Sequence, residues 1–442
     1  MANVRADDAA HDPAALARQL DRTVARLGSL LEATKALAAA TDLDAKLEVI
    51  LARATEVMQA ERSSLFIYDE GTGTLWNRLS GTLSPGDVRI ALGAGLAGDA
   101  ARSGRLVNVP DAYLDPRFER QWDRETQFRT RSVLCAPLFT HSRALVGVLQ
   151  VLNKAGGGAF DADDEALMEA FASHAGIAID TARLVEAFLE KERIEASLRL
   201  AQEIQAAMLP RRFPVRPEVD LSARISPARM VGGDLYDFLL AGDRLWFLVG
   251  DVSGKGVSSA LFMAMTKTLF RATLQDASSS PAEVLGRVNR ELSADNERAM
   301  FVTAFLGCLD LRTGEVVFAN GGHNPPYRLE PGGGLTPVTG GHGAALGILE
   351  GYLYETASLT LAPGEGLVLF TDGVTEALDP AGEQFSEERL EAHLRTLTTT
   401  PAVDVVGRTF DVVRAFAASA PASDDITVMS LRYLGPGARG EV

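Results

Sequence analysis

Aspartates at the ends of predicted strands are the side chains in this sequence best placed to do chemistry. Asp251 and Asp372 each follow an apolar, strand-like run, and Asp424 and Asp425 open another. Asp234 follows two consecutive glycines. Carboxylates beside glycines that expose backbone carbonyls are typical ligands of hard divalent cations, and two such ions can clamp a phosphoryl group and activate water. Each aspartate taken alone is equally typical of a turn. Their spacing does not unite them, so both interpretations stay open.

The composition restricts the classes of partner. The chain has 442 residues, with 43 basic and 59 acidic side chains and a net charge of −16. An acidic protein is repelled by phosphate backbones and anionic lipid, so we expect neither nucleic acid nor a membrane as a partner. No apolar run approaches the roughly 18 residues of a membrane span, and the N-terminus does not resemble a signal peptide. We therefore expect a cytoplasmic protein.

The pattern of apolar residues predicts an α+β chain in four parts. Residues 1–40 contain a helix with a short heptad-like seam, which fits either a coiled coil or one amphipathic helix. Residues 41–182 alternate like an antiparallel sheet bracketed by helices. A helical pattern then continues through residues 183–210 and ends at Pro210. Residues 211–435 predict two packed sheets with helices outside them.

Five short motifs follow one another in the last part of the chain. They are MVGGDLYD at 230–237, GDVSGKG at 250–256, NGGHNPP at 320–326, TDGVTE at 371–376 and DDIT at 424–427. In this order they resemble the motifs of SpoIIE-like serine/threonine phosphatases, the bacterial branch of the metal-dependent PPM family and one that includes regulators of sigma factors. The preceding segment, AQEIQAAMLP at 201–210, resembles the helix that leads into that domain.

The resemblance implies a β-sandwich flanked by helices, with two Mn²⁺ or Mg²⁺ ions at one end. Asp251 would bridge both ions, and the carbonyl of Val252 would bind one of them. Asp372 and Asp424 would complete the sites, and Asp425 is the alternative to Asp424. Asp234 would act through the outer sphere or a further ion. Asp251 and Asp372 are thus the expected catalytic residues.

The same resemblance implies a reaction and a partner. A metal-bound hydroxide would attack phosphoserine or phosphothreonine in line, on a phosphorylated protein such as a STAS-type anti-sigma-factor antagonist. His323 would either donate a proton or orient its loop. A catalytically weak phosphatase fold that acts as a scaffold is the alternative from another class.

Residues 41–182 resemble a GAF domain. The resemblance rests on VNVPD at 107–111, SVLCAPL at 132–138 and VGVLQV at 146–151. It implies a sensor module that would regulate the phosphatase through residues 183–210. We expect a homodimer formed through the helical segments.

A further signature bears on what this module binds. Asn153, Lys154, Phe160 and Asp164 resemble the NKxxF…DE signature of cyclic-nucleotide-binding GAF domains, although three glycines lengthen the gap before the phenylalanine. These four residues are the candidate ligand-binding set. A cyclic nucleotide, another small ligand and a ligand-free dimerisation module all remain open, and so does a receptor that acts by binding alone.

Overall fold

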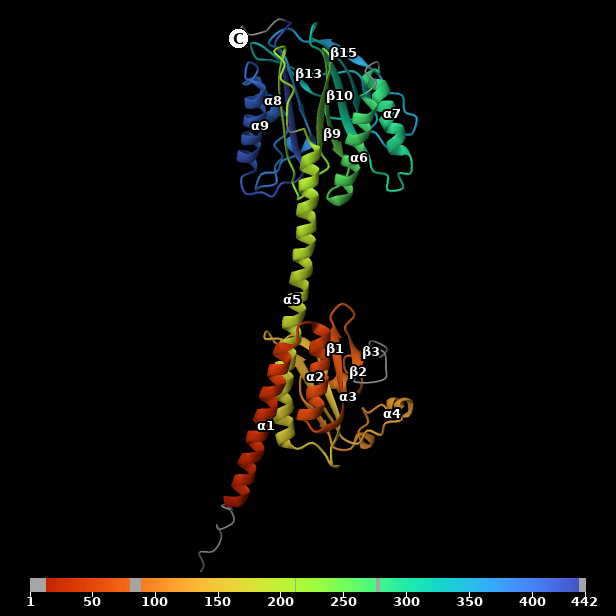
Figure 1. Ribbon diagram of the computed structural model, residues 1–442, viewed down its shortest axis with the longest axis vertical. Helices are drawn as coiled ribbons and strands as arrows, with labels where there is room; N and C mark the ends of the chain where they lie inside the picture. The colour runs from red at the N-terminus through yellow and green to blue at the C-terminus, as the bar shows by residue number, and fades with distance from the viewer. Residues whose placement is uncertain (1–12, 80–88, 211, 276–278, 437–442) are drawn as a thin grey trace, which may run out of the picture. The chain divides into compact units, whose positions relative to one another are not determined.

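The computed structural model describes residues 13–79, 89–210, 212–275 and 279–436. The chain divides into two compact units, Met1–Arg193 and Ile194–Val442 (Figure 1). Among the described helices, none combines the length and the apolar character needed to cross a membrane.

The first unit is one antiparallel sheet in the order β3-β2-β1-β6-β5-β4. Its strands are β1 (Ala60–Asp69), β2 (Thr74–Leu79), β3 (Arg89–Ala91), β4 (Val107–Val109), β5 (Val133–Phe139) and β6 (Leu145–Lys154). Its helices are α1 (Pro13–Ala39), α2 (Leu43–Val57), α3 (Gly95–Ser103) and α4 (Gln121–Thr126), with a 3₁₀ turn at Ala112–Leu114 and the first part of α5 (Ala162–Met208).

Apolar side chains at helical spacing hold α2 and α5 against one face of this sheet. Ile50 of α2 and Phe171 and Ile179 of α5 are fully buried in the same core as Leu149 of β6. The helix α3 covers the other face, where Ala100 joins a separate apolar cluster. Burial on both faces explains why the central strands read as continuous apolar runs.

The second unit contains two sheets. One has the order β14-β11-β10-β9-β8, with β15 also paired to β11, and the other has the order β13-β12-β16-β17-β7. The strands of the first sheet are β8 (Leu235–Ala241), β9 (Arg244–Val252), β10 (Val302–Asp310), β11 (Glu315–Gly321), β14 (His342–Gly343) and β15 (Ala357–Thr360). The strands of the second are β7 (Val219–Ser226), β12 (Tyr327–Glu330), β13 (Gly334–Pro337), β16 (Gly366–Phe370) and β17 (Ile426–Tyr433).

The two sheets pack face to face through aromatic and aliphatic side chains. Phe247 and Phe305 of one sheet share a buried core with Leu367 and Met429 of the other. The helices lie outside, as Figure 1 shows for α6, α7, α8 and α9. Their bounds are α6 (Val257–Thr273), α7 (Pro281–Ser293), α8 (Glu387–Arg395) and α9 (Ala402–Ala417). The predicted sandwich with flanking helices is therefore present.

Several elements of this unit were not predicted, among them β8 and α9. The residues of β8 overlap the glycine-rich motif at 230–237, and its first four residues are all buried, so they show no alternation. The helix α9 is rich in valine, which favours strands in isolation. It forms because Val405, Phe410 and Val413 fall on one face and are buried against the second sheet. In α9, tertiary packing outweighs intrinsic propensity.

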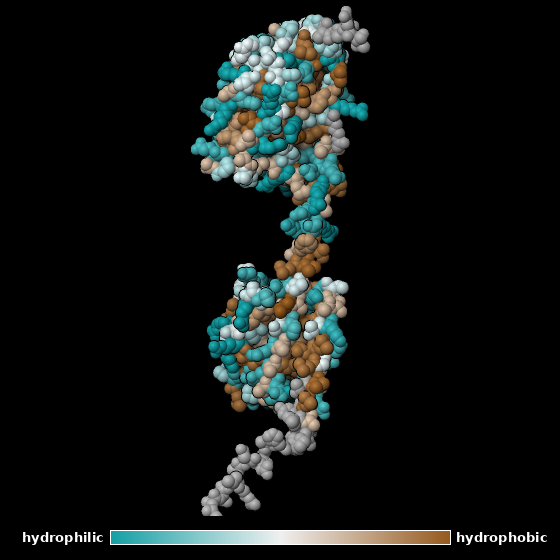
Figure 2. All heavy atoms as spheres, turned by 90° about the vertical axis from the view of Figure 1, so that its left-hand side faces the viewer, coloured by the Kyte–Doolittle hydropathy of each residue, from teal (hydrophilic) through white to brown (hydrophobic). Residues whose placement is uncertain are grey.

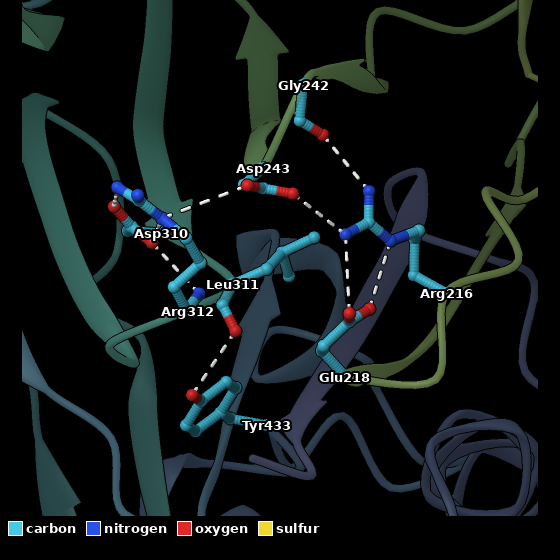
Figure 3. Close-up of polar contacts among 8 residues, drawn as sticks. All are labelled: Arg216, Glu218, Gly242, Asp243, Asp310, Leu311, Arg312 and Tyr433. Carbon is cyan, nitrogen blue, oxygen red and sulfur yellow. Dashed lines mark hydrogen bonds and ion pairs between the residues drawn. The ribbon is translucent and has the colours of Figure 1, made fainter. Parts of the chain in front are cut away.

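A network of ion pairs joins the turns at one end of the sandwich (Figure 3). Arg216 lies 2.9 Å from Glu218 and 3.1 Å from Asp243 in the β8–β9 turn. Arg312 lies 3.1 Å from Asp310 in the β10–β11 turn. Because β8 and β9 form a hairpin, this turn lies at the far end of the hairpin from the start of β8. The candidate catalytic aspartates lie at that other end.

Candidate active site

Strand pairing brings the predicted aspartates to one end of the sandwich. In the first sheet, Leu235 at the start of β8 pairs with Gly250, so Asp234 and Asp251 are brought together. In the second sheet, the last residue of β16 pairs with β17 near its start, so Asp372 and Asp424 are also brought together. The four carboxylates therefore come from two pairs of neighbouring strands, one pair in each sheet, and the two pairs are far apart in the sequence.

Asp234 links the two sheets. Its side chain is only 2% exposed, and one carboxylate oxygen accepts hydrogen bonds from Thr371 Oγ1 at 2.8 Å and Thr427 Oγ1 at 2.6 Å. Thr371 follows β16 and directly precedes Asp372, and Thr427 lies in β17, three residues after Asp424. Asp234 also shares a side-chain hydrogen bond with Asp251. Its position is therefore fixed by contacts from both sheets.

The carboxylates disturb one another's ionisation. Burial, and then the charge of Asp251, raise the pKa of Asp234 well above its usual range. Burial, followed by the charges of Asp372 and Asp424, raises the pKa of Asp251. Burial, together with Glu376 and Asp424, also raises the pKa of Asp372. Buried like charges are costly, so this end of the sandwich favours positive charge.

Asp424 and Asp425 point to different partners. Asp424 forms an ion pair with Lys255, whose Nζ lies 2.7 Å from Oδ2. The Asp425 carboxylate instead accepts backbone N–H groups from Ala228 at 2.8 Å and Gly233 at 2.6 Å. Asp425 therefore holds the segment before β8 in place, which is a role that its sequence position did not predict.

Two glycines allow the segments to approach this closely. A Cβ atom on Gly373 would lie 1.9 Å from the backbone oxygen of Asp425. A Cβ atom on Gly233 would lie 2.7 Å from the carbonyl oxygen of Val252, the oxygen predicted to bind a metal. Real Cβ atoms do not tolerate such contacts, so both motifs need glycine at these positions.

His323 is buried behind the site. Its Nδ1 lies 2.9 Å from Thr303 Oγ1, and its backbone is held by Asn320, whose side chain accepts from His323 N at 2.7 Å. Burial lowers the pKa of His323 to about 4. A neutral, buried imidazole with these contacts fits the loop-orienting alternative better than proton donation.

The donor set suits hard divalent cations, although it is not closed around a common point. Within the described residues, no three His, Cys, Asp or Glu side chains stand together as a complete metal site. Lys255 takes a carboxylate oxygen of Asp424 that a cation would need. Clustered carboxylates with raised pKa values beside the backbone carbonyl of Val252 nonetheless match the oxygen ligands of Mg²⁺ and Mn²⁺. By this test the residues fit such a group.

Comparison with known families assigns both units. The model of "Stage II sporulation protein E (SpoIIE)" matches residues 241–434, and the GAF domain model matches residues 42–179. The chain therefore matches a GAF domain followed by a SpoIIE-type domain. The predicted resemblance and the α+β fold class are confirmed. Both matched ranges lie inside the predicted domains at 41–182 and 211–435, whose boundaries stay predictions.

Individual relatives agree with this assignment. "Protein IcfG" of Synechocystis is 32% identical over 230 residues, which is 46% of this chain and 35% of that protein. "Phosphoserine phosphatase RsbU" of Bacillus subtilis is 28% identical over 186 residues, 42% of this chain and 55% of that protein. The SiaA-PP2C domain of Pseudomonas aeruginosa, a solved structure, is 26% identical with a TM-score of 0.51, and covers 55% of this chain and 98% of that one. The chain thus spans about a third to just over half of these curated relatives.

The GAF domain contains a cavity of about 400 Å³. Ser64, Asn77 and Gln150 contribute polar groups from the sheet, while Phe118 and Trp122 contribute aromatic surface. The register of β1 pairs Ser64 with Gln150 and its neighbour Phe66 with Asn77, which places these side chains on one face of the sheet. The cavity has the size and mixed lining of a small-molecule site.

The predicted signature residues do not line this cavity. Lys154 Nζ lies 2.7 Å from Asp164 Oδ1 and 5.7 Å from the centre of the buried Phe160 ring. Asn153 accepts a hydrogen bond from the backbone N–H of Arg131 at 2.6 Å. These contacts fasten the β6–α5 connection to the sheet, so the four residues act here as a structural lock.

Proposed function

We propose that this protein is a metal-dependent protein serine/threonine phosphatase regulated by its GAF domain. The observation that carries the proposal is the meeting of four aspartates from separate segments at one end of a PP2C-like sandwich. Asp251 and Asp372 are the proposed catalytic residues, in a site for two Mn²⁺ or Mg²⁺ ions. The proposed metal ligands are Asp234, Asp251, the carbonyl of Val252, Asp372 and Asp424.

The chain's own residues prepare this site for phosphoryl transfer. Divalent cations, when bound, would supply charge neutralisation at the phosphate and activation of water. Thr371 and Thr427 fix the buried carboxylate of Asp234 through hydrogen bonds of 2.8 and 2.6 Å. Asp425 holds the backbone that carries Asp234, whereas Asp424 forms an ion pair with the half-exposed Lys255 and makes no such backbone contact to that segment. This division of roles favours Asp424 over Asp425 as the metal ligand.

The proposed substrate is a phosphorylated protein. The relative RsbU is named a phosphoserine phosphatase, and the sigma-factor regulators of this family suggest a STAS-type anti-sigma-factor antagonist as the partner. The acidic residues of the site could not hold a phosphate without cations, because buried carboxylates repel it. Substrate binding should therefore depend on the metal as strongly as catalysis does.

The helical segments favour a homodimer. Apolar side chains are exposed along α1 and along α5. Figure 2 shows apolar surface in brown on α5. Single exposed apolar residues are ordinary, but rows at helical spacing are typical of helix–helix contact. The exposed residues are Leu20, Val24, Leu27 and Leu31 on α1, and Leu184, Val185, Phe188 and Leu189 on α5.

The proposed signal is a small molecule in the GAF cavity, and residues 183–210 would carry its effect to the phosphatase domain. The cavity of about 400 Å³ also favours a second candidate function, a receptor that acts by binding alone. Thermal shifts with cyclic AMP and cyclic GMP test the nucleotide hypothesis. No shift with either nucleotide would remove it.

Turnover decides between an enzyme and a scaffold. We expect the full chain to hydrolyse p-nitrophenyl phosphate and a phosphoserine protein with Mn²⁺ and to stop in EDTA. Asp372→Ala should abolish both activities while the melting profile of the GAF domain stays unchanged. Mn²⁺ binding without turnover in the wild type would instead favour the scaffold.

A further inference from the structure

The last turns of α5 contact the backbone beside the acidic site. The side-chain amide of Gln205 donates through Nε2 to the carbonyl of Gly232 at 2.6 Å. Its Oε1 accepts from the N–H of the same glycine at 3.1 Å. One side chain therefore satisfies both backbone groups of one residue, as a neighbouring strand would in a sheet.

On the side facing Asp425, Gly232 has no space for a side chain. A Cβ atom there would lie 2.1 Å from Asp425 Oδ2, and the next residue, Gly233, donates its N–H to that same oxygen at 2.6 Å. The segment is thus held between Gln205 on α5 and Asp425 before β17. Asp234 follows directly, so its position depends on both contacts.

Glutamine suits this contact through its chemistry. An amide of this length offers a donor and an acceptor side by side, which matches the N–H and the C=O of one residue. A glutamate in place of Gln205 could still accept from the Gly232 N–H, but it would turn an oxygen toward the Gly232 carbonyl and lose that hydrogen bond. A leucine there would lose both hydrogen bonds. Since Gly232 is buried, an unsatisfied backbone group there is costly.

We propose that Gln205 is a positioning residue for the acidic site, through which α5 sets the place of Asp234. The catalytic consequence rests on the proposed phosphatase function, but the positioning itself does not. Because α5 is a single helix from Ala162 to Met208, a rotation or register change of that helix would move Gln205 away from Gly232. The contact is therefore a point at which the helix can control the site.

Three variants of the full chain test this proposal. Gln205→Leu removes both hydrogen bonds, and Gln205→Glu removes only the donor. Gln202→Leu is the matched control, because Gln202 lies on the same helix and is exposed. Melting curves first verify that all three variants fold. Hydrogen exchange of residues 228–234 without metal and Mn²⁺ affinity by calorimetry are then compared with the wild type.

We expect Gln205→Leu to speed exchange in this segment and to weaken Mn²⁺ binding, each by about tenfold, with a smaller effect for Gln205→Glu. The control should stay within about twofold of the wild type. Exchange and affinity that are both unchanged in Gln205→Leu would overturn the proposal, and so would faster exchange with unchanged affinity. A wild type that binds no Mn²⁺ would overturn the proposed function instead, while the exchange result still decides whether Gln205 holds the segment.

Discussion

Replacing Asp251 by asparagine should change the stability of the SpoIIE-type domain in opposite directions with and without metal. Asp251 shares a hydrogen bond with Asp234 and is surrounded by Asp372 and Asp424. Asparagine has nearly the same shape, keeps a side-chain oxygen that can accept from Asp234 and carries no charge. Without cations the variant removes one member of a repulsive cluster, and with cations it removes a ligand.

The size of the effect follows from the electrostatics. Two unit charges about 4 Å apart repel by about 4 kcal/mol at an effective dielectric constant of about 20, and the aspartates avoid part of this cost by retaining a proton. We therefore expect Asp251→Asn to raise the metal-free unfolding free energy by about 1 to 3 kcal/mol at pH 8. Mn²⁺ at about 100 times its dissociation constant would add about 2.7 kcal/mol to the wild type alone.

The pH dependence has a definite sign. The folded-state pKa of Asp251 is raised by burial and by its acidic neighbours, so the wild type loses stability as pH rises from about 4 through that raised value. Asparagine does not titrate, so the advantage of the variant should be present at pH 8 and absent near pH 4. Denaturant unfolding at both pH values, in EDTA and in Mn²⁺, measures the four cases. A variant that is less stable than the wild type in EDTA at pH 8, or equally stabilised by Mn²⁺, would refute this reasoning.

Three further changes test other parts of the structure. Gly373→Ala would bring a methyl group to 1.9 Å from the backbone oxygen of Asp425, so we expect turnover to fall about 100-fold. The control Gly407→Ala places its methyl group in open space on α9 and should keep full activity. Lys154→Met leaves the buried Asp164 carboxylate without its 2.7 Å partner, and should lower the unfolding free energy of the GAF domain by about 3 kcal/mol; an unchanged denaturation midpoint would contradict the lock. Burial raises the pKa of Cys135 to about 12, so iodoacetamide at pH 8 should modify it only after denaturation, as mass spectrometry would show.

The sequence predicted which aspartates would form the site, but not which of two adjacent aspartates holds the backbone and which is free to bind a metal. Asp424 and Asp425 are adjacent and chemically identical, so their order along the chain cannot separate them. They differ because Asp425 reaches the N–H of Gly233, a residue 192 positions away, while Asp424 meets Lys255. Only the pairing of β17 with its neighbours reveals that difference.

The same distinction between regular patterns and contacts of distant segments applies to α5 and to the GAF cavity. The helical pattern through α5 was visible because it repeats at regular spacing up to Pro210, but the partner of Gln205 was not, because Gly232 lies in an irregular segment. In the GAF domain, the signature around Lys154 marked a structural pair and not the cavity wall. The cavity is lined from several strands and helices, so no local pattern could locate it.

The number of Mn²⁺ ions that the acidic site binds tests the proposed metal site most directly. Titration calorimetry of the wild type and of Asp372→Ala, with the GAF domain intact in both, measures stoichiometry and affinity together. We expect two ions per wild-type chain and the loss of at least one in the variant. Binding that Asp372→Ala leaves unchanged, or a wild type that takes up no Mn²⁺, would contradict the claim that these aspartates form a shared metal site.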